Sequence, residues 1–291
     1  MLRSATARLL ASRTYTPRLD AEVLLRNVLG IDRTELFARL QEPVDPIKRS
    51  EFERLVDRRI EGCPVAYLTG EREFMGLPFI VSPAVLIPRP GTEQLVEWAG
   101  RWLTWRPDAM VVDVGTGSGA IILSLAQSAK SWTGRAIGID ISEAAVEIAK
   151  TNRSRLNLQD RVELIVGDLL KPVIEPIDLI LANLPYLTPG QIMENPELAA
   201  EPRIALDGGD DGMTQVRRLI ADIPRVLRTT GALVLELDPG HVTEAVREAT
   251  THLPEARIHV EHDLENRERF VIVERINKLR SEKVDGNTGE R

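Results

Sequence analysis

The stretch from 111 to 120 constrains the fold of this chain more than any other and reads Val-Val-Asp-Val-Gly-Thr-Gly-Ser-Gly-Ala. Its first four residues favour a short buried strand, and the apolar run over 120–126 favours a helix. The alternating glycines between them permit a tight turn and a close backbone approach, while the first amides of the helix offer free N–H groups. The stretch therefore predicts a nucleotide-type binding loop between a strand and a helix.

An acid farther along the chain sharpens this prediction. Asp140 ends the next apolar run, 136–139, roughly 20 residues beyond the glycines, where a carboxylate can hold both hydroxyls of a ribose. S-adenosylmethionine and NAD both carry such a ribose, and the glycine spacing alone also fits the relaxed dinucleotide pattern. Asp113 favours S-adenosylmethionine, because an acid just before the glycines would lie near a sulfonium and would repel a pyrophosphate. The predicted cofactor contacts in the loop are Gly115, Thr116, Gly117, Ser118 and Gly119.

Composition excludes several classes of protein and of site. A chain of 291 residues can form one large or two ordinary domains with a proper core. Its single cysteine, Cys63, excludes an internal disulfide and a cysteine-based zinc site. The net charge of -7 argues against a broad nucleic-acid surface. The histidines all lie at or after 241, so we predict no metal site and no nucleophilic catalysis.

The basic N-terminus has two interpretations. Residues 1–13 contain arginines, and no acid occurs before Asp20, which is the composition of an organelle transit peptide. We favour an amphipathic first helix with Leu2, Leu9 and Leu10 on one side, because the pattern continues without a break into structured sequence. No run approaches the ~20 apolar residues that span a bilayer. The expected location is therefore the cytoplasm, with an organelle as the alternative.

The order of periodic segments divides the chain into four predicted parts. Residues 1–70 have helical spacing, and 71–90 form a β-hairpin linker turned at Gly76. Strands and helices alternate over 91–275, which predicts an α/β, Rossmann-like parallel sheet with ligands at the carboxyl ends of its strands. Two final extended runs without an intervening helix should pair antiparallel, an ending typical of class I S-adenosylmethionine-dependent methyltransferases. The polar tail, 276–291, is predicted to be disordered.

The residues after a later strand, 178–181, carry the predicted chemistry. Asn183, Leu184, Pro185 and Tyr186 would lie at the carboxyl edge of the sheet, beside the glycine loop. An amide nitrogen is a poor nucleophile, so it must be held in line with the methyl group while acceptors engage its hydrogens. The Asn183 oxygen and the Leu184 carbonyl can accept those hydrogens, Pro185 stiffens the loop, and Tyr186 offers a flat face. Alone, Asn-x-Pro-Tyr is often a simple turn; beside the loop it indicates amide or amine methylation.

Three further segments have less specific patterns. Asp168 and Leu169 end another strand run, where a carboxylate can bond an adenine amino group and an apolar neighbour can cover the ring, although a plain turn is the alternative. In the block 86–93, Thr92 can cap the following helix, and Arg89 with Glu93 can form a surface pair. The acidic loop 207–212 lacks the ligand spacing of a calcium site, so we interpret it as a loop beside the pocket.

With these motifs the sequence resembles the protein-(glutamine-N5) methyltransferases of the HemK or PrmC type. The resemblance extends over 17–275 and is carried by Arg-Leu-Asp-Ala-Glu-Val-Leu-Leu at 18–25, by Pro-Val-Ala-Tyr-Leu-Thr-Gly at 64–70 and by Leu-Ile-Pro-Arg-Pro-Gly-Thr-Glu at 86–93. Glu-Pro-Arg at 201–203 and Ala-Leu-Asp-Gly-Gly at 205–209 extend it beyond the methylation motif.

The resemblance implies a substrate and assigns different roles to different parts of the chain. It implies S-adenosylmethionine contacts at the glycine loop, Asp140, the Asp168-Leu169 pair and Asn183, with the substrate glutamine held by 183–186. The helical domain would help to grip a peptide chain release factor, whose glutamine lies in a Gly-Gly-Gln loop. The chain is expected to be a monomer, with no membrane or direct nucleic-acid partner. Leu184 and Gly91 depart from the usual proline and acid, which predicts a less rigid loop at Leu184.

Other functions stay open at this point. A relative that methylates a ribosomal-protein glutamine would share most of these blocks. Asn-Leu-Pro-Tyr is also the form found in ribosomal RNA adenine dimethyltransferases, although the acidic net charge and the Pro-Arg-Pro block at 88–90 oppose N6-adenine methylation. A non-enzyme that merely binds the cofactor would require a broken methylation motif, and the motif here is chemically intact.

Overall fold

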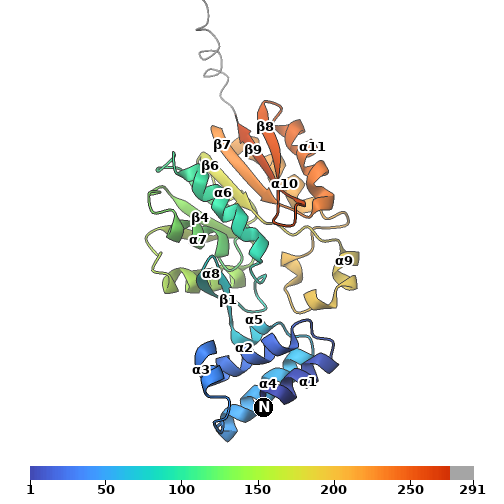
Figure 1. Ribbon diagram of the computed structural model, residues 1–291. Coiled ribbons are helices and arrows are strands. Elements are labelled where there is room, and N and C mark those ends of the chain that lie inside the picture. The colour runs from blue at the N-terminus through green and yellow to red at the C-terminus, as the bar shows by residue number, and fades with distance from the viewer. Residues whose placement is uncertain (276–291) are drawn as a thin grey trace, which may run out of the picture.

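A seven-stranded sheet forms the centre of the computed structural model, which describes residues 1–275 (Figure 1). The tail predicted to be disordered, 276–291, lies outside the described residues. The strand order is β5-β4-β3-β6-β7-β9-β8, and among these strands β9 alone runs in the opposite direction to the others. The strands are β3 (Val111–Val114), β4 (Ala136–Asp140), β5 (Val162–Val166), β6 (Ile177–Ala182), β7 (Leu227–Glu236), β8 (Ala256–His262) and β9 (Glu268–Arg275). The predicted antiparallel ending is confirmed, with β9 inserted between β7 and β8.

Helices cover both faces of the sheet, because most of its strands are apolar on both sides. Val111 and Leu181 pack with one layer of helices, whereas Val112 and Ile180 pack with the other. The first layer contains α6 (Glu93–Leu103), α7 (Ala120–Ser128) and α8 (Glu143–Arg155), and the second contains α10 (Thr214–Val226) and α11 (Val242–His252). This arrangement leaves the carboxyl ends of the parallel strands as the edge at which ligands bind.

The N-terminal helices form a separate cluster below the sheet (Figure 1). The first helix buries Leu9 and Ala5 against the others, so the amphipathic helix expected at the N-terminus is confirmed. Leu10 differs from the expectation: 64% of it is exposed, because it lies on the outer side of the helix. These helices are α1 (Leu2–Ala11), α2 (Pro17–Leu29), α3 (Arg33–Ala38), α4 (Pro46–Ile60) and α5 (Val65–Thr69).

The expected hairpin connects this cluster to the sheet domain. Strands β1 (Glu71–Phe74) and β2 (Leu77–Ile80) pair antiparallel, with Phe74 opposite Leu77. Met75 and Gly76 form the two-residue turn with φ angles of 54° and 72°, the left-handed backbone that such tight hairpin turns require. The hairpin side chains Phe74 and Phe79 join the core beneath α6 and α7.

Short elements surround the carboxyl edge of the sheet. Between β6 and α10 the chain forms α9 (Pro189–Glu194), η2 (Pro196–Leu198) and η3 (Arg203–Ala205), which project beside the sheet in Figure 1. The turns η1 (Pro90–Thr92) and η4 (Pro239–His241) precede α6 and α11. Among the described residues, none of the helices has the length and apolar character needed to cross a membrane.

Candidate active site

The glycine loop connects the end of β3 to the start of α7 as predicted. Gly115, Gly117 and Gly119 all have positive φ angles, of 75°, 56° and 81°, which side-chain-bearing residues rarely adopt. At Gly115 a Cβ atom would lie 3.1 Å from the Leu184 side chain, so the loop also needs glycine for close packing. The Gly115 amide donates to the Ile139 carbonyl at 2.8 Å, which holds the loop against β4.

Asp140 ends β4 and holds the glycine loop directly. One carboxylate oxygen accepts from the Gly117 amide at 2.8 Å, and the other accepts from the Ser142 amide at 2.9 Å. Burial raises the pKa of Asp140, while these backbone hydrogen bonds oppose that rise. The carboxylate thus lies at the pocket wall with its orientation already fixed.

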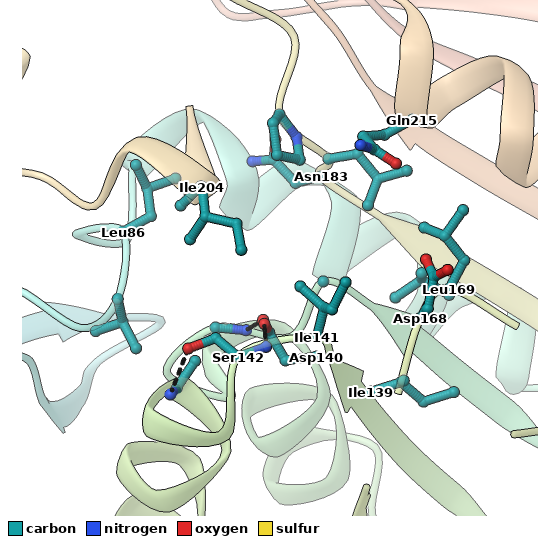
Figure 2. Close-up of a pocket in the computed structure, with 18 of the residues that line it drawn as sticks. Leu86, Ile139, Asp140, Ile141, Ser142, Asp168, Leu169, Asn183, Ile204 and Gln215 are labelled. Carbon is teal, nitrogen blue, oxygen red and sulfur yellow. Dashed lines mark hydrogen bonds between the residues drawn. The ribbon is translucent and has the colours of Figure 1, made fainter. Parts of the chain in front are cut away.

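A pocket opens where these elements meet the carboxyl edge of the sheet. Figure 2 shows Asn183 across the opening from Asp140, with Leu86 and Ile204 on one side and Asp168 and Leu169 on the other. The lining includes eight predicted site residues: Gly115, Gly117, Asp140, Asp168, Leu169, Asn183, Leu184 and Pro185. The other predicted residues, Thr116, Ser118, Gly119 and Tyr186, belong to the same segments but lie outside this lining.

Asp168 differs in detail from the expected adenine contact. Its Oδ2 atom accepts from Lys171 and from Arg218, each at 2.6 Å. These hydrogen bonds lower the pKa of Asp168, which keeps it ionised. The neighbouring Leu169 has a φ of 51° and turns its backbone sharply at the pocket wall. The Asp168 side chain is therefore shared between the pocket and a surface ion cluster.

Asn183 is held by a partner that the sequence motifs did not predict. Its Nδ2 atom donates to the Thr92 hydroxyl at 3.2 Å, so the side-chain oxygen is left to meet a substrate. Thr92 was expected to cap α6, but it makes no side-chain cap bond and lies buried beneath the pocket instead. Thr92 bonds Asn183 and does not cap α6, because the tertiary structure places η1 next to the end of β6.

Leu184, in the segment 183–186 that we call the methylation segment, is buried where the family usually has a proline. Its side chain is 4% exposed and packs in the core beside Val114 and Ala182. The loop beside it, 207–212, packs on the following backbone, since a Cβ atom at Gly208 would lie 2.8 Å from the Pro185 carbonyl oxygen. The less rigid loop expected at Leu184 stays a prediction, and 207–212 is the neighbouring loop that the sequence indicated.

Arg89 and Glu93 do not form the expected surface pair. Arg89 pairs with Glu201, a buried residue that also accepts from the Ile87 amide at 3.1 Å. Glu93 turns the other way and accepts from the Met75 amide at 2.7 Å. Glu201 thus holds the first part of the 86–93 segment, and Glu93 connects the end of the segment to the hairpin turn.

Asp113 lies behind the glycine loop and outside the pocket lining. It is fully buried, and its carboxylate accepts from the Thr116 hydroxyl at 2.6 Å. Burial raises the pKa of Asp113 to about 7. The expectation that Asp113 lies beside a cofactor charge is therefore corrected: its side chain faces α7, and it acts on the loop through Thr116.

Sequence reasoning missed Thr92, Asn152, Glu201 and Glu236 as supports of the site. Two of them leave a signal in the sequence, since each is a polar residue in an apolar pattern. Asn152 follows Ala145, Val146 and Ala149 on the buried face of α8, and Glu236 interrupts the run 232–237. Among the described residues, no cluster of histidine, cysteine or carboxylate side chains is suited to hold a metal ion.

Comparison with known proteins places this geometry in a family. Residues 1–70 match the model of the PrmC N-terminal domain, and 106–272 match a methyltransferase domain. The release factor glutamine methyltransferase of Moorella thermoacetica is 42% identical over 238 residues, covering 81% of this chain and 83% of the relative. This chain belongs to the release factor glutamine methyltransferase family. The Mycolicibacterium smegmatis member is 38% identical and covers 94% of this chain and 96% of its own.

Solved structures agree with the fold. A methyltransferase from Pyrococcus furiosus has a TM-score of 0.51 at 16% identity, covering 69% of this chain and 90% of its own, a likeness of fold alone. The predicted α/β class I methyltransferase fold is thus confirmed, as is the resemblance to the PrmC type. Membership in this family also makes the chain a methyltransferase enzyme and excludes the non-enzyme interpretation.

Proposed function

We propose that this methyltransferase transfers a methyl group from S-adenosylmethionine to the side-chain amide nitrogen, N5, of the glutamine in the Gly-Gly-Gln loop of class I peptide chain release factors. The observation that carries the proposal is the placement of Asn183, Leu184 and Pro185 in the same pocket as Asp140, in a member of this family. The wall that contains Asp140 is suited to bind a nucleoside, and the facing wall, which contains Asn183, is suited to bind an amide. We also propose that the enzyme acts as a monomer in the cytoplasm.

The pocket residues fit S-adenosylmethionine. A Cβ atom at Gly117 would meet nothing within 4 Å, so this part of the loop leaves open space beside Asp140. The Asp140 carboxylate can accept from ribose hydroxyls, and Ile141 and Leu169 offer apolar surfaces for a planar base. When bound, the cofactor supplies an electrophilic methyl group on a sulfonium, which leaves as a neutral thioether.

The protein's part in transfer is to orient the amide. Asn183 Oδ1 and the Leu184 carbonyl can each accept a hydrogen of the glutamine NH₂ group, which aims the nitrogen lone pair at the methyl carbon. The nitrogen forms the new bond to carbon, and it then gives a proton to water. A strong general base is unnecessary, because the thioether leaves without a charge. Tyr186 and the buried Leu184 side chain help to keep the carbonyl in place.

The helical domain is the proposed second contact with the release factor. It lies below the sheet domain in Figure 1. Leu19 is half exposed and Tyr15 is 92% exposed at the junction of α1 and α2. Apolar side chains that are exposed in this way can bind a protein surface beyond the glutamine loop.

Methyl transfer from radiolabelled S-adenosylmethionine tests the proposal. The purified enzyme is offered, in separate reactions, a release factor, its Gln→Ala loop variant, a ribosomal-protein substrate and bare ribosomal RNA. We expect label on the release factor and none on the loop variant. Label on the ribosomal protein alone would instead assign the related glutamine methylation, and label on the RNA alone would assign adenine methylation; either result contradicts the proposal.

A further inference from the structure

Three residues from separate parts of the chain meet behind the methylation segment. Asn183 and Glu236 lie at the carboxyl ends of the neighbouring parallel strands β6 and β7, where Ala182 is in register with Leu235. Thr92 ends η1 at the start of α6, the helix that covers this face of the sheet. The sheet register and the start of α6 therefore bring an amide, a hydroxyl and a carboxylate together.

These three side chains lie next to one another, with Thr92 and Glu236 away from solvent. Asn183 Nδ2 donates to the Thr92 hydroxyl oxygen at 3.2 Å, and the Thr92 hydroxyl faces the Glu236 carboxylate, whose pKa it lowers against the effect of burial. Thr92 is 5% exposed and Glu236 is 4% exposed. Because a carboxylate only accepts, we infer that the single hydroxyl hydrogen of Thr92 points toward Glu236. The hydroxyl oxygen then has only lone pairs to offer Asn183.

We propose that Thr92 and Glu236 are positioning residues that fix which way the Asn183 amide faces. With the Thr92 hydrogen committed to Glu236, only the amide nitrogen of Asn183 can face the hydroxyl. Turning the amide over would place Oδ1 against an oxygen that has no hydrogen to give. Glu236 thereby keeps Oδ1 of Asn183 directed at the substrate amide, although it does not touch the substrate itself.

The burial of Glu236 supports a role of this kind. It stands in the apolar run 232–237, and its Oε2 atom has no hydrogen-bond partner among the described residues. A buried carboxylate with an unpartnered oxygen disfavours folding, and an uncharged side chain of similar size would be more favourable there. The Glu236 carboxylate therefore does not stabilise the fold, but it can orient the hydroxyl of Thr92.

Protonation of Glu236 would remove this control. Burial raises the pKa of Glu236 to about 7, and the Thr92 hydrogen bond and the Arg269 guanidinium oppose that rise. The other titratable group that faces it is the phenol of Tyr186. A protonated Glu236 can itself donate to Thr92, whose hydrogen is then free to bond Asn183 Oδ1. The turned amide becomes as favourable as the productive one, so kcat should rise with pH through about 7.

The inference rests on the proposed function, so its first test does not use activity. In ¹⁵N-edited NMR spectra of the full-length enzyme, the Asn183 side-chain amide should show one hydrogen-bonded proton that is protected from exchange. Thr92→Val, which keeps the shape but removes the hydroxyl, should abolish that protection. Thr92→Ser should retain it. Protection that persists in Thr92→Val would overturn the proposal, whatever the substrate of the enzyme proves to be.

The second test separates positioning from folding and cofactor binding. With the substrate that the wild-type enzyme labels, Thr92→Val should lower kcat by about 100-fold, the scale expected for a misplaced reacting group. Its Kd for S-adenosylmethionine should equal that of the wild type, and Thr92→Ser should recover most of the rate. Equal damage in both variants, or wild-type kcat in Thr92→Val, contradicts a positioning role.

The pH profile tests Glu236 separately. In an Asp113→Asn background, which removes the other carboxyl with a pKa of about 7, Glu236→Gln should retain the fold and remove the rise in kcat near pH 7, because residue 236 then carries no group that ionises. Glu268→Gln, an exposed acid on β9, is the matched control and should keep the wild-type profile. A rise in kcat that survives Glu236→Gln in that background would overturn the role of this carboxylate.

Discussion

Asn152 hydrogen-bonds both backbone groups of Ile80: its Oδ1 accepts from the Ile80 amide at 2.7 Å, and its Nδ2 donates to the Ile80 carbonyl at 3.0 Å. The same Nδ2 donates to the Ser118 carbonyl at 2.9 Å. One fully buried side chain on α8 thus connects the hairpin to the glycine loop. The cofactor loop and the linker to the helical domain therefore share a single support.

Replacing this support should destabilise the protein. Asn152→Ala leaves the backbone groups of Ile80 and Ser118 without their partner, and each unsatisfied buried group costs about 1–3 kcal/mol. We expect the free energy of unfolding to fall by about 2–4 kcal/mol. Urea denaturation measures the change. Thr151→Ala, at the exposed neighbouring position on α8, is the control and should change stability little; an equal loss in both variants would contradict this role.

Asn183→Ala should separate catalysis from cofactor binding. The variant loses the side-chain oxygen that is proposed to accept from the substrate amide, so kcat should fall by about 10²–10³-fold. Calorimetric titration should show cofactor affinity close to that of the wild type. Full turnover in this variant would remove the assignment of Asn183 to the transfer step.

Asp140→Ala should weaken cofactor binding more than it slows methyl transfer. The carboxylate holds the Gly117 and Ser142 amides and is proposed to accept from the ribose. Hydrogen bonds to a charged group contribute about 1.5–3 kcal/mol, so we expect the Kd for S-adenosylmethionine to rise about 10- to 100-fold. Saturating cofactor should restore part of the rate. Unchanged affinity would show that the ribose is held elsewhere.

The buried acids should make stability fall as pH rises. Burial raises the pKa of Asp113 from 3.8 to about 7, so between these values the folded state holds a proton that the unfolded state has released. The free energy of unfolding therefore decreases with rising pH across this window and levels off above it. Glu236 contributes with the same sign.

Asp113→Asn should remove the Asp113 part of this slope. Chemical denaturation at several pH values between about 4 and 8 measures it, against a limit of about 1.4 kcal/mol per pH unit for each group. Asp178→Asn is a less buried control on the same sheet and should keep the slope. If Asp113→Asn unfolds with the wild-type pH dependence, the carboxyl is ionised in the folded protein.

Several contacts at the site were beyond prediction from the sequence. The sequence shows that Leu184 replaces the usual proline, but it does not show the core into which the leucine packs. Arg89 and Glu93 looked like partners because they are four residues apart. In the folded chain Glu201, far along the sequence, is the partner of Arg89.

The sequence by itself determined the elements and the edge at which the site forms. Apolar periodicity defined the strands and helices, and the residues after β3, β4, β5 and β6 were assigned to one ligand edge because parallel strands end together. Only the tertiary structure decided the partners behind that edge. Thr92 meets Asn183 and Glu236, and Asn152 meets Ile80, because strand register and helix packing join positions far apart in the chain. Such contacts depend on distance in space, and local sequence patterns carry no record of it.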